Sequence, residues 1–214
     1  MSGAFLPIDN DAKSDIIKIK DVNVLEQAKT RDHKIYINDV AISKVNPPTI
    51  PGFSDEQNQK FSELHKELLR KSMEENDSNE TACLFDPISL NYVFHHGGIN
   101  SVDILENPEA FSMLNSDRYS GLYLLHNHPS TKTFSYADIG VLLLYYNIEG
   151  ITVITNDGDV QCLIKTDKYS FDKAYEVLQN IRNEYTSDVP DEQEDAEIVK
   201  KFIKNSKKTG IIIL

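Results

Sequence analysis

Two histidines two positions apart, followed by a carboxylate, are the residues of this chain best suited to chemistry. They lie in the stretch LLHNHPSTKTFSYAD, which contains His126, His128 and Asp138. Side chains at positions i and i+2 of an extended strand point to the same face, so a strand here would direct both imidazoles to one point. We therefore expect these three residues to form a metal site.

A strand end and a helix start are needed to bring the three side chains together. The apolar run at 121–128 predicts a strand, and Pro129 should stop it because proline has no backbone N–H for a sheet ladder. Ser135 is placed as the N-cap of a helix, with Asp138 three residues later. The helix should continue to Tyr146 and present an apolar face made of Ile139, Leu142, Leu143 and Tyr146.

Two histidines and one carboxylate would leave a tetrahedral zinc ion with one open position, which separates a catalytic zinc from a structural one. Water in that position is acidified by the metal and can attack a carbonyl, provided that a general base takes its proton. A glutamate is the usual base. A nearby hydroxyl can also donate a hydrogen bond to the developing oxyanion, which is worth roughly 3 kcal/mol. Ser135 is the hydroxyl nearest to Asp138 in the chain, apart from the phenol of Tyr136.

The pattern His126-x-His128-Pro129 followed by Ser135-x-x-Asp138 resembles the signature of the JAMM (MPN/JAB) metallopeptidases. The resemblance covers about residues 54–178. It implies one zinc ion with His126, His128 and Asp138 as ligands, and Ser135 as the stabiliser of the oxyanion. The loop between His128 and Ser135 is one residue shorter than the commoner family spacing, as in some bacterial and phage-associated members.

The resemblance also implies Glu80 as the general acid/base. In the family this glutamate opens a strand that follows a long helix, and Glu80 stands between a helical stretch and an apolar run. From the residues alone Glu80 is one acid among many, so Glu74, Glu75 and Glu106 stay open as alternatives.

Simpler readings exist for each part of the motif. Ser-x-x-Asp is also an ordinary capping box that starts helices for stability alone. A lone His-x-His is weak evidence of metal binding. The combination of His-x-His-Pro after an apolar strand, a helix-opening Ser-x-x-Asp and an upstream glutamate favours the metal site.

Composition narrows the class of protein. The chain has 214 residues, 40% of them hydrophobic, and a net charge of −12, which argues against a nucleic-acid partner because phosphate contacts need clustered Lys and Arg. It shows neither an apolar stretch of about 18 residues nor a basic leader, so we expect no membrane association and a cytoplasmic location. Cys83 and Cys162 lie in apolar segments without metal-ligand spacing and are expected to be reduced core residues.

The chain divides into an N-terminal extension (1–53), a JAMM-like domain (54–185) and an acidic linker with a C-terminal helix or strand (186–214). Residues 1–30 are expected to be poorly ordered, and Lys34–Ile42 to form a strand or two. The pair His95-His96, before two glycines, is interpreted as a surface turn rather than as part of a cleft.

Alternation of strand and helix patterns predicts an α/β fold with a mixed sheet flanked by helices in three layers, the arrangement implied by the MPN/JAB (cytidine-deaminase-like) resemblance. We expect helices at 54–75, 107–114, 135–146, 170–185 and 196–204, and strands at 81–85, 91–94, 101–104, 121–128, 151–155, 160–164 and 210–214.

The leading hypothesis is a zinc-dependent hydrolase of peptide or isopeptide bonds acting on a peptide or protein, including one that carries a ubiquitin-like modifier. The segment between Asp138 and Ile151 is too short for the long insertion of eukaryotic ubiquitin-specific relatives, which favours a bacterial or phage type. The alternatives are an MPN-type binding scaffold without catalysis and a RadC-like protein in a DNA-repair context, which the acidic balance disfavours. Oligomeric state is left open.

Overall fold

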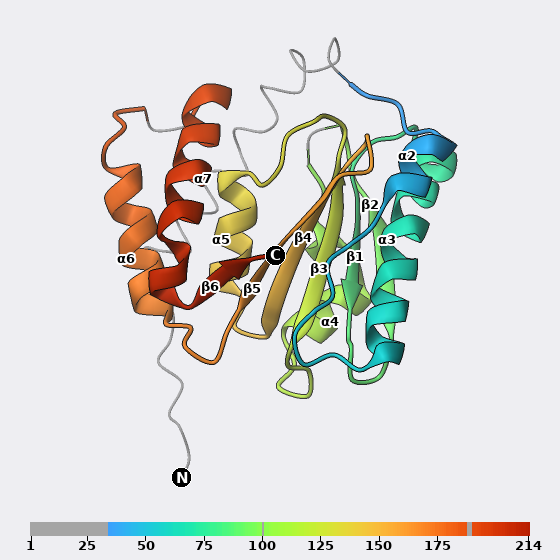
Figure 1. Ribbon diagram of the computed structural model, residues 1–214, viewed down its shortest axis with the longest axis horizontal. Helices are drawn as coiled ribbons and strands as arrows, with labels where there is room; N and C mark the ends of the chain where they lie inside the picture. The colour runs from blue at the N-terminus through green and yellow to red at the C-terminus, as the bar shows by residue number, and fades with distance from the viewer. Residues whose placement is uncertain (1–33, 100, 188–189) are drawn as a thin grey trace.

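A computed structural model describes residues 34–214 except for 100 and 188–189, so the expectation of disorder at 1–30 lies outside the described residues. A six-stranded mixed sheet forms the centre of the molecule, in the order β2-β1-β3-β4-β5-β6 (Figure 1). Only β3 and β4 pair in parallel; the other neighbours are antiparallel. The strands are β1 (Thr81–Phe85), β2 (Tyr92–His96), β3 (Leu122–His128), β4 (Ile148–Thr155), β5 (Val160–Lys165) and β6 (Ile211–Ile213).

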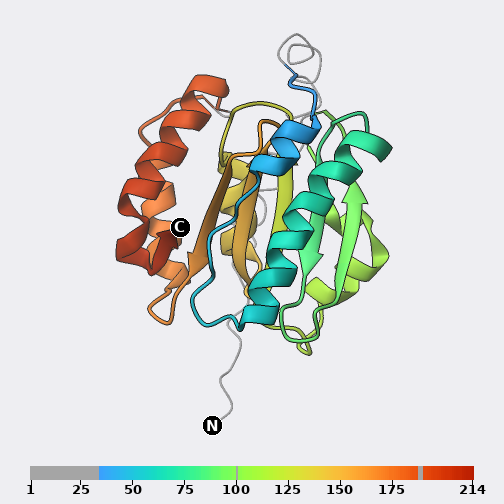
Figure 2. The ribbon, with the colours of Figure 1, turned by 45° about the vertical axis from the view of Figure 1, so that its right-hand side comes forward.

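Helices cover both faces of this sheet (Figures 1 and 2). On one face lie α2 (Asp39–Lys44) and α3 (Asp55–Glu75), and on the other lie α4 (Pro108–Leu114), α5 (Tyr136–Leu144), α6 (Phe171–Arg182) and α7 (Glu192–Ser206). Short 3-10 turns occupy Ile104–Glu106 and Lys207–Thr209. The predicted α/β class, with a mixed sheet between helical layers, is confirmed. Among the described residues, no helix is long and apolar enough to cross a membrane.

The alternation of side chains along β3 divides the interior into two cores. Leu122 and Leu124 pack in the core beneath α5, whereas Tyr123 and Leu125 pack in the core beneath α3. Because successive strand residues point to opposite faces, His126 and His128 lie on the α5 side, and Asn127 between them lies on the α3 side. The sheet therefore separates the imidazoles from the asparagine.

Residues at its two ends determine where the helix α3 begins and stops. Ser54 accepts a hydrogen bond from the Gln57 N–H and Gln57 caps Ser54 in return, which confirms the predicted capping box. Its buried side chains recur at helical spacing, from Phe61 to Ser72. The helix stops at Asn76, and two residues with left-handed backbone follow before the chain enters β1.

The helix α5 has the predicted N-cap and a different end. Ser135 accepts from the Asp138 N–H, and the Asp138 carboxylate accepts from the Ser135 N–H, so the capping box is confirmed. The helix ends at Leu144 rather than at Tyr146, whose exposed phenol donates to Asp117. The chain must turn there because the buried Asn147 donates its amide to carbonyls at the end of α4.

Two predicted strands are wrong. The segment expected to be extended at 34–42 instead contains α2, because Asn38 accepts a hydrogen bond from the Ala41 N–H and starts a helix. The strand expected at 101–104 is replaced by the turn at Ile104–Glu106, where the Asp103 side chain accepts from the Leu105 N–H. In both places a short polar side chain bonds the backbone and outweighs a weak alternation of apolar residues.

His95 and His96 end strand β2 and do not form the expected surface turn. They pair across the ladder with Ala82 and Thr81 of β1. The pairing with β1 continues beyond them, since the Gly97 N–H donates to the Glu80 carbonyl. The reversal of the chain therefore comes after the glycines rather than at the histidines.

The C-terminal elements complete the sheet and one helical layer. The helix α7 begins at Glu192, earlier than predicted, because Asp191 caps it and acidic residues suit the positive end of a helix. The strand β6 pairs with β5 at the edge of the sheet, as expected. The tight hairpin between β4 and β5 is also confirmed: Gly158 has φ +91°, and a side chain there would collide with the Ala41 carbonyl.

Candidate metal centre

Three segments meet at one end of the sheet on its α5 side. They are the carboxyl end of β3, the N-terminus of α5 and the residue that precedes β1. The strand β3 continues into α5 through the six loop residues 129–134 and the N-cap Ser135, so both elements keep their ends close together. Ligands in open α/β sheets usually bind at such carboxyl ends.

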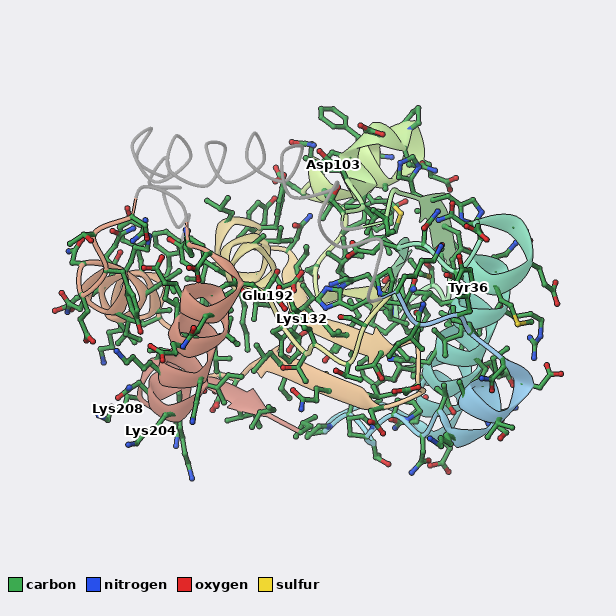
Figure 3. All side chains as sticks on the ribbon, turned by 90° about the horizontal axis from the view of Figure 1, so that it is seen from above. Tyr36, Asp103, Lys132, Glu192, Lys204 and Lys208 are labelled. Carbon is green, nitrogen blue, oxygen red and sulfur yellow. The ribbon has the colours of Figure 1, made fainter. Side chains whose placement is uncertain are left out.

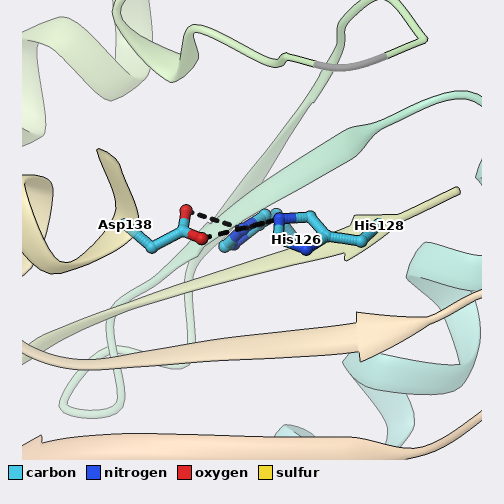
Figure 4. Close-up of side chains that lie close together, drawn as sticks. All are labelled: His126, His128 and Asp138. Atoms are coloured by element: carbon cyan, nitrogen blue, oxygen red, sulfur yellow. Dashed lines mark hydrogen bonds and ion pairs between the residues drawn. The ribbon is translucent and has the colours of Figure 1, made fainter. Parts of the chain in front are cut away.

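His126, His128 and Asp138 converge as the sequence predicts (Figure 4). The Nε2 atom of His126 lies 2.9 Å from Oδ1 of Asp138, and Nε2 of His128 lies 3.5 Å from Oδ2. The two Nε2 atoms are 3.1 Å apart. All three side chains are largely shielded from solvent.

These separations are close to the spacing of donor atoms around a metal ion, with a different Asp138 oxygen nearest each imidazole. Zinc bonds of about 2.0–2.1 Å in a tetrahedral arrangement place neighbouring ligand atoms about 3.3 Å apart. The distances between the imidazole nitrogens and the carboxylate fall on both sides of that value. Three protein ligands also leave a fourth position for water or substrate. The cluster can therefore hold a metal ion with an open coordination position.

The two imidazoles lie in different surroundings. Burial lowers the pKa of His128 to about 4, although Asp138 opposes the shift, so the ring is unprotonated at neutral pH. Its Nδ1 lies 3.3 Å from the Lys132 carbonyl, which selects the tautomer that donates from Nδ1 and leaves Nε2 free to bind a metal. Nδ1 of His126 is buried without a hydrogen-bond partner among the described residues.

Asp138 is ionised despite its position inside the protein. Burial raises the pKa of this carboxyl, but His126, His128 and the Ser135 backbone N–H together outweigh burial and hold the pKa well below its usual range. Oδ2 accepts from the Ser135 N–H and from the Ser135 hydroxyl, each at 2.7 Å. The cap of α5 thus orients the carboxylate towards the histidines.

Glu80 lies on the same face of the sheet as the three ligands. It stands two residues before Ala82, whose partner across the β1–β3 ladder is His126, so its side chain points to the α5 side. The residue is 7% exposed. Burial, and then the negative charge of Asp138, raise its pKa well above the ordinary value. The structure therefore places a buried, protonatable carboxyl beside the three candidate ligands.

The alternative glutamates lie elsewhere. Glu74 and Glu75 are exposed on α3, where Glu75 pairs with Lys71 and His96. Glu106 is exposed and pairs with His95. Of the four acids that the sequence left open, Glu80 is the one that shares a buried face with the ligands.

Ser135 is fully engaged in the helix cap. Its hydroxyl donates to Asp138 and accepts from the Asp138 N–H at 3.2 Å. The Ser-x-x-Asp capping box is therefore present, and it is compatible with the predicted role of Asp138 as a metal ligand. The role of Ser135 in binding an oxyanion stays a prediction.

Sequence reasoning missed two residues that support the site. Asn127, between the histidines, bonds the backbone on both sides of Glu80. Asp195 of α7 accepts a hydrogen bond from the Tyr136 N–H at the start of α5. The loop that follows β3 also reaches α7, through the exposed ion pair Lys132–Glu192 (Figure 3). The spacing of Asn127 between two ligands was an available signal, whereas nothing local points to Asp195.

Comparisons with protein-family models, curated proteins and solved structures find no match to this chain.

Proposed function

We propose that this protein is a zinc-dependent hydrolase of peptide or isopeptide bonds with a JAMM-type site. The observation that carries the proposal is the convergence of two imidazoles and one ionised carboxylate, with a buried glutamate on the same face of the sheet. Three ligands, an open position and an adjacent general acid/base are the parts that metal-assisted amide hydrolysis needs.

His126, His128 and Asp138 would hold the zinc ion. Zinc bound there would polarise a water molecule and the substrate carbonyl. Glu80 would take the proton of the attacking water and return it to the leaving amine. The positive charge of a zinc ion bound there would favour the ionised form of Glu80, against burial and the charge of Asp138, which both raise its pKa.

Ser135 would donate its hydroxyl hydrogen bond to the developing oxyanion. The hydroxyl now donates to Asp138, so this role requires a change of its partner. Asp138 would keep its orientation in that state, because its Oδ2 also accepts from the Ser135 backbone N–H.

We infer that the substrate is a peptide or protein, including one joined to a ubiquitin-like modifier. The connection between α5 and β4 spans only residues 145–147, which leaves no room there for an additional substrate-binding insertion. The net charge of −12 opposes a nucleic-acid substrate. Two free, buried cysteines fit the reducing environment of the cytoplasm, which we propose as the location.

Elemental analysis of the purified protein tests the metal centre first. We expect about one zinc per chain in the wild type and little in the double variant His126→Ala/His128→Ala. The matched control is His95→Ala/His96→Ala, a second histidine pair that lies outside the cluster and should leave the zinc content unchanged. Peptide and isopeptide libraries then test hydrolysis.

Equal and negligible metal in all three proteins, persisting after reconstitution with zinc, would overturn the proposal. The chain would then be better described as an MPN-type scaffold, and the search would turn to binding partners.

A further inference from the structure

A buried polar network lies behind the metal ligands, on the α3 side of the sheet. Its centre is Asn127, which is fully buried and points away from His126 and His128. A buried amide must satisfy both its oxygen and its nitrogen, so the partners of Asn127 are fixed by the fold.

The side chain of Asn127 bonds both neighbours of Glu80. Its Oδ1 accepts from the Thr81 N–H at 2.8 Å, and its Nδ2 lies 3.1 Å from the Asn79 carbonyl as a donor. The same nitrogen approaches Oδ1 of Asn156 at 2.8 Å and Oγ of Ser72 at 3.2 Å. One amide therefore holds the chain immediately before and immediately after Glu80.

The turn that leads to Glu80 requires such support. Asp77 and Ser78 have φ +49° and +56°, a left-handed conformation that is unfavourable for residues with side chains. The network holds Ser78 in place, since its N–H donates to the Ser72 carbonyl at 2.7 Å and its carbonyl accepts from Asn156 at 2.9 Å. Unfavourable backbone persists only where surrounding contacts determine it.

We propose that Asn127 is a positioning residue that sets Glu80 relative to the metal ligands. Asn127 belongs to the same short stretch of β3 as His126 and His128, so its bonds fix the start of β1 against the strand that carries two of the three ligands. The catalytic part of this inference rests on the proposed function. The structural part, the immobilisation of Glu80, does not.

The test compares Asn127→Ala with Asn147→Ala. Asn147 is an equally buried asparagine that donates to the carbonyls of Met113 and Leu114, away from the ligand cluster. Once a substrate is identified, Asn127→Ala should have the zinc content and the KM of the wild type. Its kcat should fall about 10- to 100-fold, as expected for a misplaced catalytic group. Asn147→Ala should keep kcat. An equal loss of kcat in both variants would overturn the proposal.

Amide hydrogen exchange supplies a measurement that needs neither metal nor substrate. The Glu80 N–H donates to the Gly98 carbonyl at 2.9 Å, and the Gly97 N–H donates to the Glu80 carbonyl at 2.8 Å. Both amides should lose most of their protection in metal-free Asn127→Ala and keep it in Asn147→Ala. Unchanged protection of the Glu80 and Gly97 amides in Asn127→Ala would show that Asn127 does not hold the chain around Glu80 in place.

Ser72→Ala is the milder second variant if Asn127→Ala fails to fold. It removes a hydroxyl that donates to the Asn79 carbonyl and contacts Asn127, and it should loosen the same two amides to a smaller extent. Failure of the wild type to hydrolyse any substrate would count against the proposed function alone, because the exchange experiment would still decide the role of Asn127.

Discussion

The backbone N–H of Tyr136, the first residue of α5, donates a hydrogen bond to the carboxylate of Asp195 at 2.9 Å. These residues are 59 positions apart. The first turn of a helix has N–H groups without helical partners, and an acid placed there satisfies one of them and complements the helix dipole. The N-terminus of the helix that carries Asp138 is therefore capped by α7, and the C-terminal region supports the candidate metal centre.

Asp195→Ala should weaken the metal centre without removing a ligand. The loss of a cap on α5 should lower the free energy of unfolding by about 1 kcal/mol, measured by urea denaturation of the metal-free protein. The variant should also release zinc to a chelator more readily than the wild type. Glu192→Ala is the control, because its ion pair with Lys132 is exposed and should contribute little. Equal effects of the two changes would contradict this role of Asp195.

Glu80→Gln should retain zinc and lose hydrolysis. Glutamine keeps the size of the side chain but cannot take a proton from water, so kcat should fall by about 10²- to 10⁴-fold. Zinc content and turnover of the same preparation check this. Glu75→Gln, on the exposed surface of α3, should behave as the wild type. Normal turnover by Glu80→Gln would place the general base elsewhere.

Asp138→Ala should lose zinc and also destabilise the metal-free protein. The carboxylate is both a candidate ligand and the acceptor for the Ser135 N–H, so its removal should cost about 0.5–2 kcal/mol in the free energy of unfolding. Asp172→Ala, at an exposed position in the first turn of α6, controls for the loss of an acid at a helix start. A variant that still holds one zinc would show that Asp138 is not a ligand.

A buried histidine outside the metal centre should make stability depend on pH. Nδ1 of His65 lies 2.7 Å from the Phe61 carbonyl and Nε2 lies 3.0 Å from the Thr152 hydroxyl. Burial lowers the pKa of His65 to about 4, although the bond to Phe61 opposes the shift. The unfolded chain, with the ordinary pKa of 6.5, therefore binds the proton more readily. The contribution of neutral His65 to the free energy of unfolding should be fully present above pH 6.5. It should fall by on the order of 3 kcal/mol as the pH drops towards 4.

Urea denaturation of metal-free protein at several pH values from about 4 to above 6.5 tests this dependence, because these are the pKa values of His65 in the folded and the unfolded chain. His65→Gln should be less stable than the wild type at neutral pH and should lose part of the slope, because burial also lowers the pKa of His128 to about 4. His96→Gln, on the edge strand, should keep the slope. An unchanged slope in His65→Gln would assign the acid sensitivity to other groups.

Strong local signals allowed most of the architecture to be predicted from the sequence. The capping boxes at Ser54 and Ser135 gave the starts of α3 and α5, and the Asp-Gly turn gave the β4–β5 hairpin. These signals act within a few residues, so they operate in any tertiary context. The convergence of His126, His128 and Asp138 followed from the same local rules, because strand periodicity and a helix start determine where the side chains point.

Features that depend on distant parts of the chain were not predictable in this way. The Asn127 side chain contacts three segments that only the folded sheet brings together, and Asp195 reaches α5 across the helical layer. The alternation of apolar and polar residues also predicted strands wrongly where apolar residues were few, as around Asn38 and Asp103. There a single hydrogen bond from a side chain to the backbone decided the local structure. Burial of Glu80, which distinguishes it from the other acids, appears only in three dimensions.

The alternation along β3 makes the protein unequally tolerant of insertions and deletions. One residue added or removed within Leu122–Leu125 would shift the parity of the strand, turning both histidines towards α3 and Asn127 towards α5. The proposed metal site and the hydrogen bonds of Asn127 on both sides of Glu80 would then be lost together. The neighbouring loop, 129–134, is not part of the sheet. Its length can therefore change while His126 and His128 still point to the α5 side. Variation in length among related chains should therefore gather in this loop and be missing from the strand that precedes it.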